Sequence, residues 1–469
     1  MAFFQYFTKN DMELIHEATV HVMEKTGVIF SYDPALKVLA KAGCKIEGQR
    51  VYFPPKLVEE QVAKAPSKFT LYARNPEKNV VIGGDNIAFV PFAGPPFVTD
   101  LDRGRRKSLL DDYINFVKLA QESKNIDING GILVEPNDIP NDKRNMTRVY
   151  ASIRYSDKPF MGGCLGRESA RETIEMASMI FGSEKEMAQK PPFISILCSL
   201  SPLAYDDRML GAIIEYAKAG MPQLISSLTM AGATGPVTLE GTQVVQNAEI
   251  LAGITLSQLI REGTPVVFSG SSSNTAMRHG SLAVGSPEMA VSSIATAQMA
   301  RFYGIPCRSG GAITDSKIVD AQAGFEAMMG QLTATLSGVN FVLHSAGIME
   351  TYMAASYEKF IIDDEICGMC KRIKRGQRVT PERLAIDLIN EVGPGGEFLT
   401  QMHTFQNFRQ EFYQPAMEER GIFKNWQKQG SRPIEQVANE KWKTILKNFK
   451  DPCLSLSENN ALKLYMNKK

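Results

Sequence analysis

Histidine is scarce in this sequence, and grouped metal ligands are missing. Only five histidines occur among the 469 residues, at positions 16, 21, 279, 344 and 403. None of them forms a zinc-type pair with a cysteine or a glutamate at ligand spacing. We therefore expect no tightly bound metal.

An excess of one charge and a long apolar run are absent too. Lysine and arginine number 52 and aspartate and glutamate 51, which argues against nucleic acid or an anionic membrane as the main partner. No stretch reaches the roughly 18 apolar residues of a membrane span. The N-terminal residues lack the basic and apolar regions of a secretory signal. We expect a cytoplasmic protein.

The cysteines do not suggest a disulfide framework, because their number, seven, is odd and the chain is long. Cys198 and Cys307 lie within apolar runs, where we expect buried thiols that behave as small hydrophobic side chains. Cys367 and Cys370 form a C-x-x-C pair with no second pair after it, so structural thiols are favoured over a redox or metal site. No Walker loop, dinucleotide fingerprint or serine-hydrolase elbow is present.

What the sequence does contain is a regular series of short apolar runs rich in valine, isoleucine and phenylalanine. Most are roughly 30 to 40 residues apart, which leaves room for a helix in each gap. Continuous apolar runs are typical of parallel strands buried on both faces. The eight runs predict an α/β fold, a (β/α)8 TIM barrel, with strands at 87–92, 126–134, 159–163, 193–199, 223–227, 265–270, 305–309 and 340–344.

The segments on either side of this series have a different texture. Residues 1–85 predict a helical lead-in with a hairpin around Gly48, and 86–370 the barrel domain. Residues 371–469 are more polar and predict a helical extension packed on the barrel, with helices at 382–392 and 432–442.

Active sites of such barrels lie at the carboxyl ends of the strands, and here those ends are rich in small and hydroxyl residues. Among the few charged residues nearby, Glu249, Asp315 and His344 are the candidate catalytic residues. Gln322 and Glu326 are four residues apart and would share a helix face. Alternatively, Asp315 is a helix N-cap, Glu326 part of a solvated face, and His344 a packed structural residue.

Aromatic residues gather near the same strand ends. Phe92, Phe97 and Tyr352 are candidates for contact with a substrate, with Tyr357 and Phe360 close by in the sequence. A quaternary ammonium group cannot donate a hydrogen bond, so proteins hold it with aromatic faces and nearby carboxylates. Each of these aromatics taken singly is more often part of a core.

Two stretches of the sequence are similar to a known family. The run Met-Ala-Gly-Ala-Thr-Gly-Pro at 230–236, and Thr-Asp-Ser-Lys at 314–317 followed by Asp-Ala-Gln-Ala-Gly-Phe-Glu at 320–326, resemble the trimethylamine methyltransferase family. Archetypal members contain pyrrolysine. This chain has no unusual residue and so resembles the branch without pyrrolysine, whose members demethylate betaines.

The resemblance implies transfer of a methyl group from a betaine, such as glycine betaine, proline betaine or a carnitine-type compound, to the Co(I) of a corrinoid. That corrinoid would be carried by a separate protein docking at the barrel mouth. The substrate carboxylate would be held by hydroxyls such as that of Ser226, or by a loop arginine, Arg278 or Arg308. His344 would donate a hydrogen bond to it, and one or two carboxylates would offset the substrate's positive charge. The sequence leaves a homo-oligomer open and does not give the oligomeric state.

Two other interpretations remain open at this stage. One is a metal-free barrel lyase or aldolase, for which Lys317 is the one lysine in a suggestive loop. The other is a non-catalytic protein that binds a betaine. Formation of methylcobalamin from cob(I)alamin would occur only with the methyltransferase.

Overall fold

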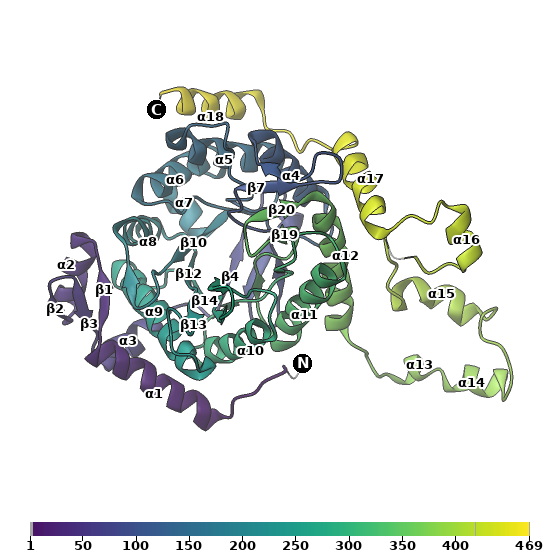
Figure 1. The fold of residues 1–469 in the computed structure, drawn as a ribbon, viewed down its shortest axis with the longest axis horizontal. Coiled ribbons are helices and arrows are strands. Elements are labelled where there is room, and N and C mark those ends of the chain that lie inside the picture. Colours follow the sequence, from purple (N-terminus) through teal and green to yellow (C-terminus); the bar gives the residue numbers. More distant parts are fainter. Residues whose placement is uncertain (1–2, 418, 469) are drawn as a thin grey trace.

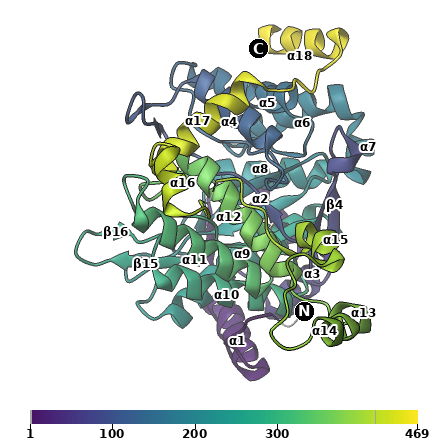
Figure 2. The same ribbon diagram turned by 90° about the vertical axis from the view of Figure 1, so that its right-hand side faces the viewer.

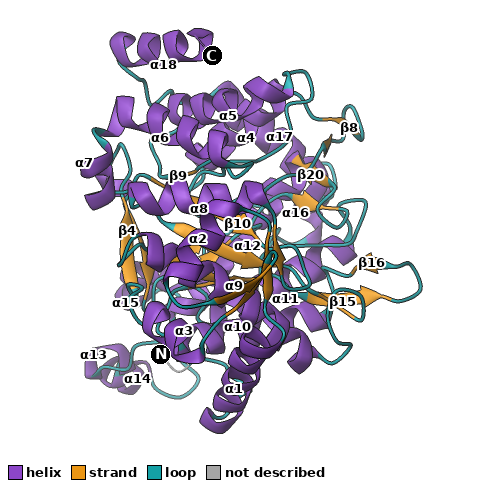
Figure 3. Ribbon diagram, turned by 90° about the vertical axis from the view of Figure 1, so that its left-hand side faces the viewer, coloured by secondary structure: helices purple, strands orange, loops and turns teal. Residues whose placement is uncertain are grey.

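Residues 3–417 and 419–468 are described by a computed structural model of the chain. Figure 1 looks nearly along the axis of a barrel of strands ringed by helices, and Figures 2 and 3 show it from two sides. No helix in these two ranges is long and apolar enough to cross a membrane.

The first part of the chain packs a helix and a small sheet on the side of the barrel. Its elements are α1 (Lys9–Lys25), β1 (Val28–Phe30), α2 (Asp33–Lys41), β2 (Lys45–Glu47), β3 (Arg50–Tyr52) and α3 (Pro55–Val62). Thr8 and Asp11 form a capping box that begins α1. The predicted hairpin around Gly48 is confirmed by the antiparallel β2–β3 pair. β1 also pairs in parallel with β11 (Ala204–Tyr205), which ties this lead-in to the barrel.

The barrel sheet confirms the predicted fold class. Seven strands pair in parallel, in the order β6-β18-β17-β14-β12-β10-β9. Their bounds are β6 (Ala88–Phe89), β9 (Phe160–Met161), β10 (Phe193–Cys198), β12 (Gln223–Ser227), β14 (Val266–Gly270), β17 (Cys307–Arg308) and β18 (Phe341–Val342).

The predicted strand at 126–134 is wrong as a regular strand, although its segment takes the eighth place in the barrel. Asp127 N donates to Phe89 O on one edge strand at 2.8 Å, and Asn129 N donates to Pro159 O at 2.8 Å beside the other. Gly130 and Gly131 follow, and a Cβ at Gly131 would lie 2.2 Å from the carbonyl oxygen of Met161. The close approach at these glycines ends the pairing, so the segment closes the barrel through a single bridge at Asn129.

Helices cover the outside of the barrel, and their bounds are α4 (Leu110–Glu122), α5 (Asn141–Tyr155), α6 (Arg167–Phe181), α7 (Glu184–Gln189), α8 (Asp207–Ala219), α9 (Leu239–Ile260), α10 (Pro287–Phe302), α11 (Ala321–Ser337) and α12 (Tyr357–Arg375). One helix or a helix pair follows each strand position, which is the alternation expected of βα units. At the amino ends of the strands, the hairpin of β4 (Lys68–Leu71) and β5 (Val80–Gly83), joined by η1 (Pro76–Lys78), packs Leu71 and Ile82 into the barrel interior. That end of the barrel is therefore plugged.

The opposite end, where the strands end at their carboxyl termini, is called the mouth. Two small sheets stand beside it. One contains β13 (Met230–Ala231), β15 (Ser273–Ala276) and β16 (Ser281–Leu282), and the other contains β7 (Phe97–Thr99), β8 (Arg106–Lys107), β19 (Ile348–Met349) and β20 (Ala354–Ser356). Figure 3 shows the β15–β16 hairpin projecting beyond the barrel on the side opposite β4.

The C-terminal part contains α13 (Pro381–Leu384), α14 (Ile386–Val392), α15 (Met402–Glu411), α16 (Phe423–Lys428), α17 (Ile434–Lys447) and α18 (Leu456–Lys468). The helix predicted at 432–442 is confirmed as α17, which packs on α12. The helix predicted at 382–392 is wrong in one respect, because Ala385 adopts a left-handed conformation (φ 51°) and splits it into α13 and α14. Neither short helix buries a residue that would hold the two in line.

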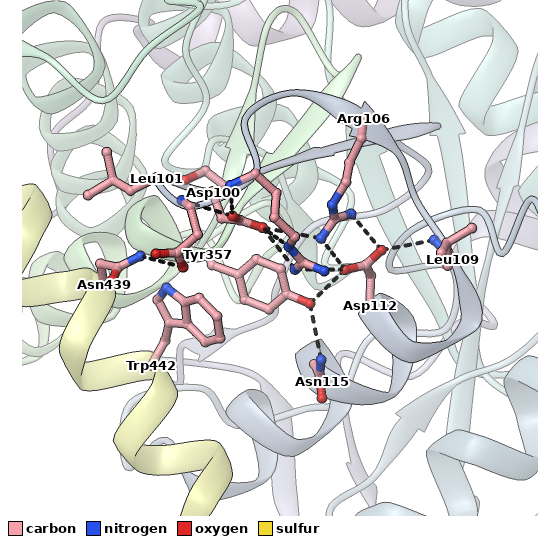
Figure 4. Close-up of polar contacts among 12 residues, drawn as sticks. Asp100, Leu101, Arg106, Leu109, Asp112, Asn115, Tyr357, Asn439 and Trp442 are labelled. Carbon is pink, nitrogen blue, oxygen red and sulfur yellow. Dashed lines mark hydrogen bonds and ion pairs between the residues drawn. The ribbon is translucent and has the colours of Figure 1, made fainter.

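A buried polar network fixes the sheet of β7, β8, β19 and β20 to the helices (Figure 4). Arg106 donates two hydrogen bonds of 2.8 Å to the carboxylate of Asp112 in α4, which also accepts from Tyr357 Oη at 2.9 Å. Asp100, beside β7, accepts a further bond from Arg106. Because β7 pairs with β20, this network holds in place the turn between β19 and β20.

Candidate functional site

Four neighbouring strands present one row of side chains at the mouth. Cys198, Ser226, Ser269 and Arg308 are register partners across β10, β12, β14 and β17. Residues two positions apart in a strand point the same way, and Leu224 and Val267, two positions below Ser226 and Ser269, belong to the cluster inside the barrel. The four side chains therefore face the barrel interior, where Ser269 Oγ donates to Ser226 Oγ at 3.0 Å.

The interior is open to solvent at this level. Cys198 is exposed and Ile196 half-buried, although Leu197, between them on the same strand, is buried. Burial by surrounding protein nevertheless raises the pKa of the Cys198 thiol, which nearby Arg308 opposes. Both observations fit a side chain that is surrounded by protein but faces the solvent-filled opening of the barrel. The prediction of a buried Cys198 is wrong for this reason, whereas Cys307 is buried as expected.

Arg308 is the most distinctive residue of the row. It is only 2% exposed, and burial lowers the pKa of its guanidinium, although an arginine remains charged. Its Nη1 donates to Ser271 Oγ, whereas its Nε has no partner in the described part of the chain. No described carboxylate lies within 4.0 Å of it, and the buried hydroxyl of Tyr352 also lacks a partner. A buried cation without a counter-charge is costly, so this arrangement suits an anionic ligand group.

His344 lies beside Arg308 and Tyr352. Its ring and that of Tyr352 are 4.8 Å apart between centroids. Ala93 N donates to His344 Nδ1 at 3.4 Å, which leaves the hydrogen of the neutral ring on Nε2. Burial, and secondarily Arg308, hold the pKa of His344 well below its usual range. The ring is therefore neutral, with Nε2 as its hydrogen-bond donor.

Asp315 and Glu326 brace three loops at the mouth. Asp315 accepts from Gly285 N at 3.0 Å, in the segment after β14, and from Thr351 Oγ1 at 2.7 Å, in the β19–β20 turn. Glu326 is buried and accepts from Thr314 Oγ1, from Asp315 N at 2.9 Å and from Gln322 Nε2 at 2.9 Å.

Their surroundings decide between the alternatives left open for these residues. A Cβ at Gly285 would lie 2.2 Å from the Glu326 carboxylate, so only glycine fits there. The N-cap of α11 is Asp320 rather than Asp315. Asp315 remains partly exposed, and its charge helps to raise the pKa of Tyr352 to about 12, behind burial as the main cause. Asp315 is thus close enough to the Arg308–Tyr352 pair to act on a bound cation.

Glu249 lies within α9 and is fully buried. Its carboxylate accepts from Ser201 Oγ at 2.8 Å, Ser227 Oγ at 2.6 Å and Leu203 N at 2.8 Å, and also from Ser199. Because these donors occupy the carboxylate, Glu249 holds the loop after β10 against the end of β12.

The candidate aromatics are divided between the mouth and the helix layer. Phe92 contacts Phe116 of α4 edge to face at 4.8 Å, and Tyr357 is stacked between Phe116 and Trp442. Phe360 also contacts Phe116. The Phe97 ring already makes a cation–π contact, because the Arg105 guanidinium lies 3.8 Å from the ring centroid. Only Tyr352 lies beside both Arg308 and His344.

Sequence reasoning missed three kinds of residue. Two of them lie at strand ends, where active sites of barrels are expected, but the sequence does not distinguish them from the other small residues there. They are Ser271, which binds Arg308, and Cys198. The Arg106–Asp112 network was missed because its sequence resembles a solvated loop. Lys359 and Asp363 in α12 form a fully buried ion pair of 2.6 Å, and their helical spacing of four residues was the available signal.

Comparisons with known proteins identify the family of the chain. The family model described as trimethylamine methyltransferase (MTTB) matches residues 1–469. A glycine betaine methyltransferase of Desulfitobacterium hafniense is 50% identical over 451 residues, which cover 96% of this chain and 94% of that protein. A trimethylamine methyltransferase MttB of the same species is 31% identical and covers 94% of this chain and 89% of its own length.

Among solved structures, the monomethylamine methyltransferase MtmB of Methanosarcina barkeri superposes with a TM-score of 0.56 at 12% identity. The match covers 96% of this chain and 90% of that one, and it supports the fold alone. The family match over the full length and the identity to two relatives decide the assignment: the chain is a methyltransferase that belongs to the trimethylamine methyltransferase family.

Proposed function

We propose that this methyltransferase takes a methyl group from a betaine and delivers it to the Co(I) of a corrinoid carried by a partner protein. The observation that carries the substrate class is Arg308, a buried cation with no counter-charge, beside the partnerless hydroxyl of Tyr352. A betaine has a carboxylate that a guanidinium binds through two parallel hydrogen bonds, whereas trimethylamine has none. The similarity to a glycine betaine methyltransferase supports the same class.

In this proposal the chain positions the substrate and keeps water away from it. Arg308, Tyr352 Oη and His344 Nε2 bind the carboxylate, and the wall of Cys198 and Ser226 bounds the rest of the molecule. The methyl group to be transferred faces the open mouth, because its acceptor arrives on another protein. The corrinoid supplies the nucleophile, so the enzyme gains most from orientation and desolvation.

The substrate nitrogen loses its positive charge as the methyl group leaves. Strong contact with several carboxylates would stabilise the substrate more than the transition state. All three carboxylates accept hydrogen bonds, but Glu249 and Glu326 are buried, whereas Asp315 is partly exposed, so in this proposal Asp315 alone of the three acts on the substrate. We assign Glu249, Glu326 and Gln322 to positioning, and Phe92 and Phe97 to the support of the loops rather than to substrate contact.

The direct test is a spectroscopic assay of methylcobalamin formation from cob(I)alamin with a panel of betaines and with trimethylamine. Transfer from at least one betaine, with little from trimethylamine, is the expected result. Transfer from trimethylamine alone would refute the substrate class, and no transfer from any of these compounds would mean that the methyl donor belongs to another class. The lyase alternative is disfavoured because Lys317 is exposed and donates to Asp315 O at 2.6 Å, rather than being a buried reactive amine.

The pH dependence follows from the neutral state of His344. Because its pKa is held well below the usual range, we expect kcat/KM for a betaine to show no inflection near the ordinary histidine pKa of about 6.5. His344→Ala should lower kcat/KM by about 10–100-fold, the loss of one hydrogen bond to a charged group. Initial rates measured across this pH range check both. A wild-type inflection near that pH that disappears in His344→Gln would contradict the neutral ring.

The partner is proposed to dock on the rim of the mouth. Six different loops that follow barrel strands each expose a large apolar side chain there: Leu165, Leu200, Val237, Met277, Ile318 and Met353. In this proposal the six side chains form the apolar part of the surface that the corrinoid protein contacts. Met277 directly follows β15, in the turn of the β15–β16 hairpin, and this hairpin projects beyond the barrel (Figures 2 and 3).

Substitution on this rim separates docking from chemistry. Met277→Asp with Ile318→Asp should raise KM for the cognate corrinoid protein about tenfold or more, and leave methyl transfer to free cob(I)alamin unchanged. Leu464→Asp, equally exposed in α18 away from the mouth, is the matched control. An unchanged KM for the corrinoid protein would place docking elsewhere.

A cytoplasmic location is part of the proposal, because all seven cysteines are free thiols.

A further inference from the structure

Residues 376–433, called the arm, leave the barrel after α12 and return at α17. Figure 1 shows α13 to α16 outside the ring of helices that encloses the barrel. None of these four helices contains a buried residue. Among the described residues of the arm, Met417 alone is buried. The arm thus has no core of its own.

The side chains that the arm exposes are nevertheless those of a core. Leu399 is 80% exposed, Phe405 66% and Phe423 65%, and Leu384, Ile386, Ile389, Met402, Phe412 and Ile422 are exposed as well. Helices of fewer than about 12 residues are marginal in water unless a face is buried against something else. Monomeric proteins rarely present so many apolar side chains in one segment. The arm therefore needs a cover that the rest of the chain does not provide.

Contacts hold the arm near its middle and leave α13, α14 and α16 largely free. Arg372 Nε donates to Glu411 O at 3.0 Å, and Ala416 N donates to the Glu365 carboxylate at 3.0 Å. These bonds fasten residues 411–417 to α12. They orient the arm without burying its apolar side chains.

We propose that the arm is a self-association segment, covered in solution by a second copy of this chain. The cover should be long-lived, because helices this short are marginal in water without one, whereas a corrinoid partner binds and leaves in each cycle. The place also favours a second copy. In Figures 2 and 3, α13, α14 and α15 lie toward the β4 end of the barrel, away from the mouth, whereas α16 lies nearer the mouth, so the contact is assigned to α13–α15.

The charge and area of the arm fit contact between identical surfaces. It contains seven lysines and arginines and seven aspartates and glutamates, so two arms brought together do not repel. An isologous contact places the same surface on both subunits, which requires such a balance. Phe405, in α15, and Phe412, directly after it, are 66% and 63% exposed. At roughly 200 Å² for a whole aromatic side chain, the exposed parts of these two supply about a third of the ~800 Å² that each partner gives to a stable interface.

Light scattering coupled to size-exclusion chromatography of the full chain tests the proposal. The expected mass is at least twice the 51.8 kDa of one chain. Leu399→Asp with Phe405→Asp should yield a species of 51.8 kDa whose circular dichroism still shows a folded barrel, because neither residue is buried in the single chain. Leu456→Asp, 82% exposed in α18, is the matched control and should keep the wild-type mass.

Three outcomes would overturn the proposal. The first is a wild-type chain that has the mass of one copy at micromolar concentration. The second is a Leu399→Asp, Phe405→Asp variant with the same mass as the wild type. The third is that amides of the arm gain protection from hydrogen exchange only when the corrinoid protein is added. The last would identify the partner protein as the cover. None of these results depends on which methyl donor the enzyme uses, so the outcome is independent of the proposed substrate.

Discussion

Replacement of Arg308 by methionine is expected to lower kcat/KM for a betaine by about 10²–10³-fold, because removing one partner of a buried charge pair costs about 2–5 kcal/mol. Thermal stability should be unchanged or higher, since the substitution removes a buried charge that has no counter-charge among the described residues. Steady-state kinetics and a thermal melt of the same preparation measure both quantities. A loss of activity through misfolding would lower Tm instead.

Two further variants define what Arg308 contributes. Arg308→Lys keeps the charge and loses the two-pronged geometry, so its activity should fall between that of the wild type and Arg308→Met. Arg278→Met removes an exposed arginine at the tip of the β15–β16 hairpin and should leave KM for the betaine unchanged. Wild-type kinetics in Arg308→Met, or a loss confined to Arg278→Met, would move the carboxylate site to the other arginine named by the sequence.

The barrel could be predicted from the sequence because parallel strands that are buried on both faces contain continuous apolar runs. Residues 193–199, 223–227 and 265–270 each contain apolar residues at neighbouring positions, hence on both faces, and each became a regular strand of the central sheet. The run at 126–134 is apolar at its ends, but Gly130 and Gly131 interrupt it, and Gly131 lies close to the Met161 carbonyl where the pairing stops. Composition alone does not contain that tertiary contact.

The site was predictable in position but not in the direction of each side chain. Ala88 and Val90 point into the barrel, and alternation would carry Phe92 inward as well. Regular pairing of β6 ends at Phe89 and Pro91 follows, so the alternation is lost and Phe92 packs on the helix layer instead. Likewise, the sequence named Arg308 but did not show that no carboxylate would approach it. That fact depends on all the neighbouring strands together.

Loss of the Asp363 carboxylate is expected to destabilise the fold strongly, because it breaks a fully buried ion pair. Lys359 and Asp363 are each about 1% exposed and joined at 2.6 Å. Asp363 also accepts from Gly347 N at 2.7 Å, and Lys359 donates to Ala312 O at 2.8 Å. The pair therefore links the loops after β17 and β18, which carry Asp315 and Tyr352. Asp363→Ala leaves a buried ammonium unpaired and should lower the free energy of unfolding by about 3–5 kcal/mol.

Urea unfolding measures this loss, and the double variant Lys359→Met with Asp363→Leu is its control. With both charges removed, much of the lost stability should return, although Gly347 N and Ala312 O still lack their partners. A double variant no more stable than Asp363→Ala would mean that the two loop contacts, rather than the unpaired charge, account for the loss.

The same pair predicts how stability depends on pH. Burial is the main cause that raises the pKa of Asp363 to about 6 from the ordinary 3.8, against the opposing attraction of Lys359. Between these values the native state binds more protons at this group than the unfolded chain, so its contribution to stability is greatest below the lower value and is lost as the pH rises toward 6. Asp363→Asn cannot titrate and should lack this decline, which urea unfolding at a series of pH values would reveal. If the decline persists unchanged in Asp363→Asn, another group causes it. The carboxylate of Asp363 would then be ionised throughout that pH range, because the attraction of Lys359 outweighs the effect of burial.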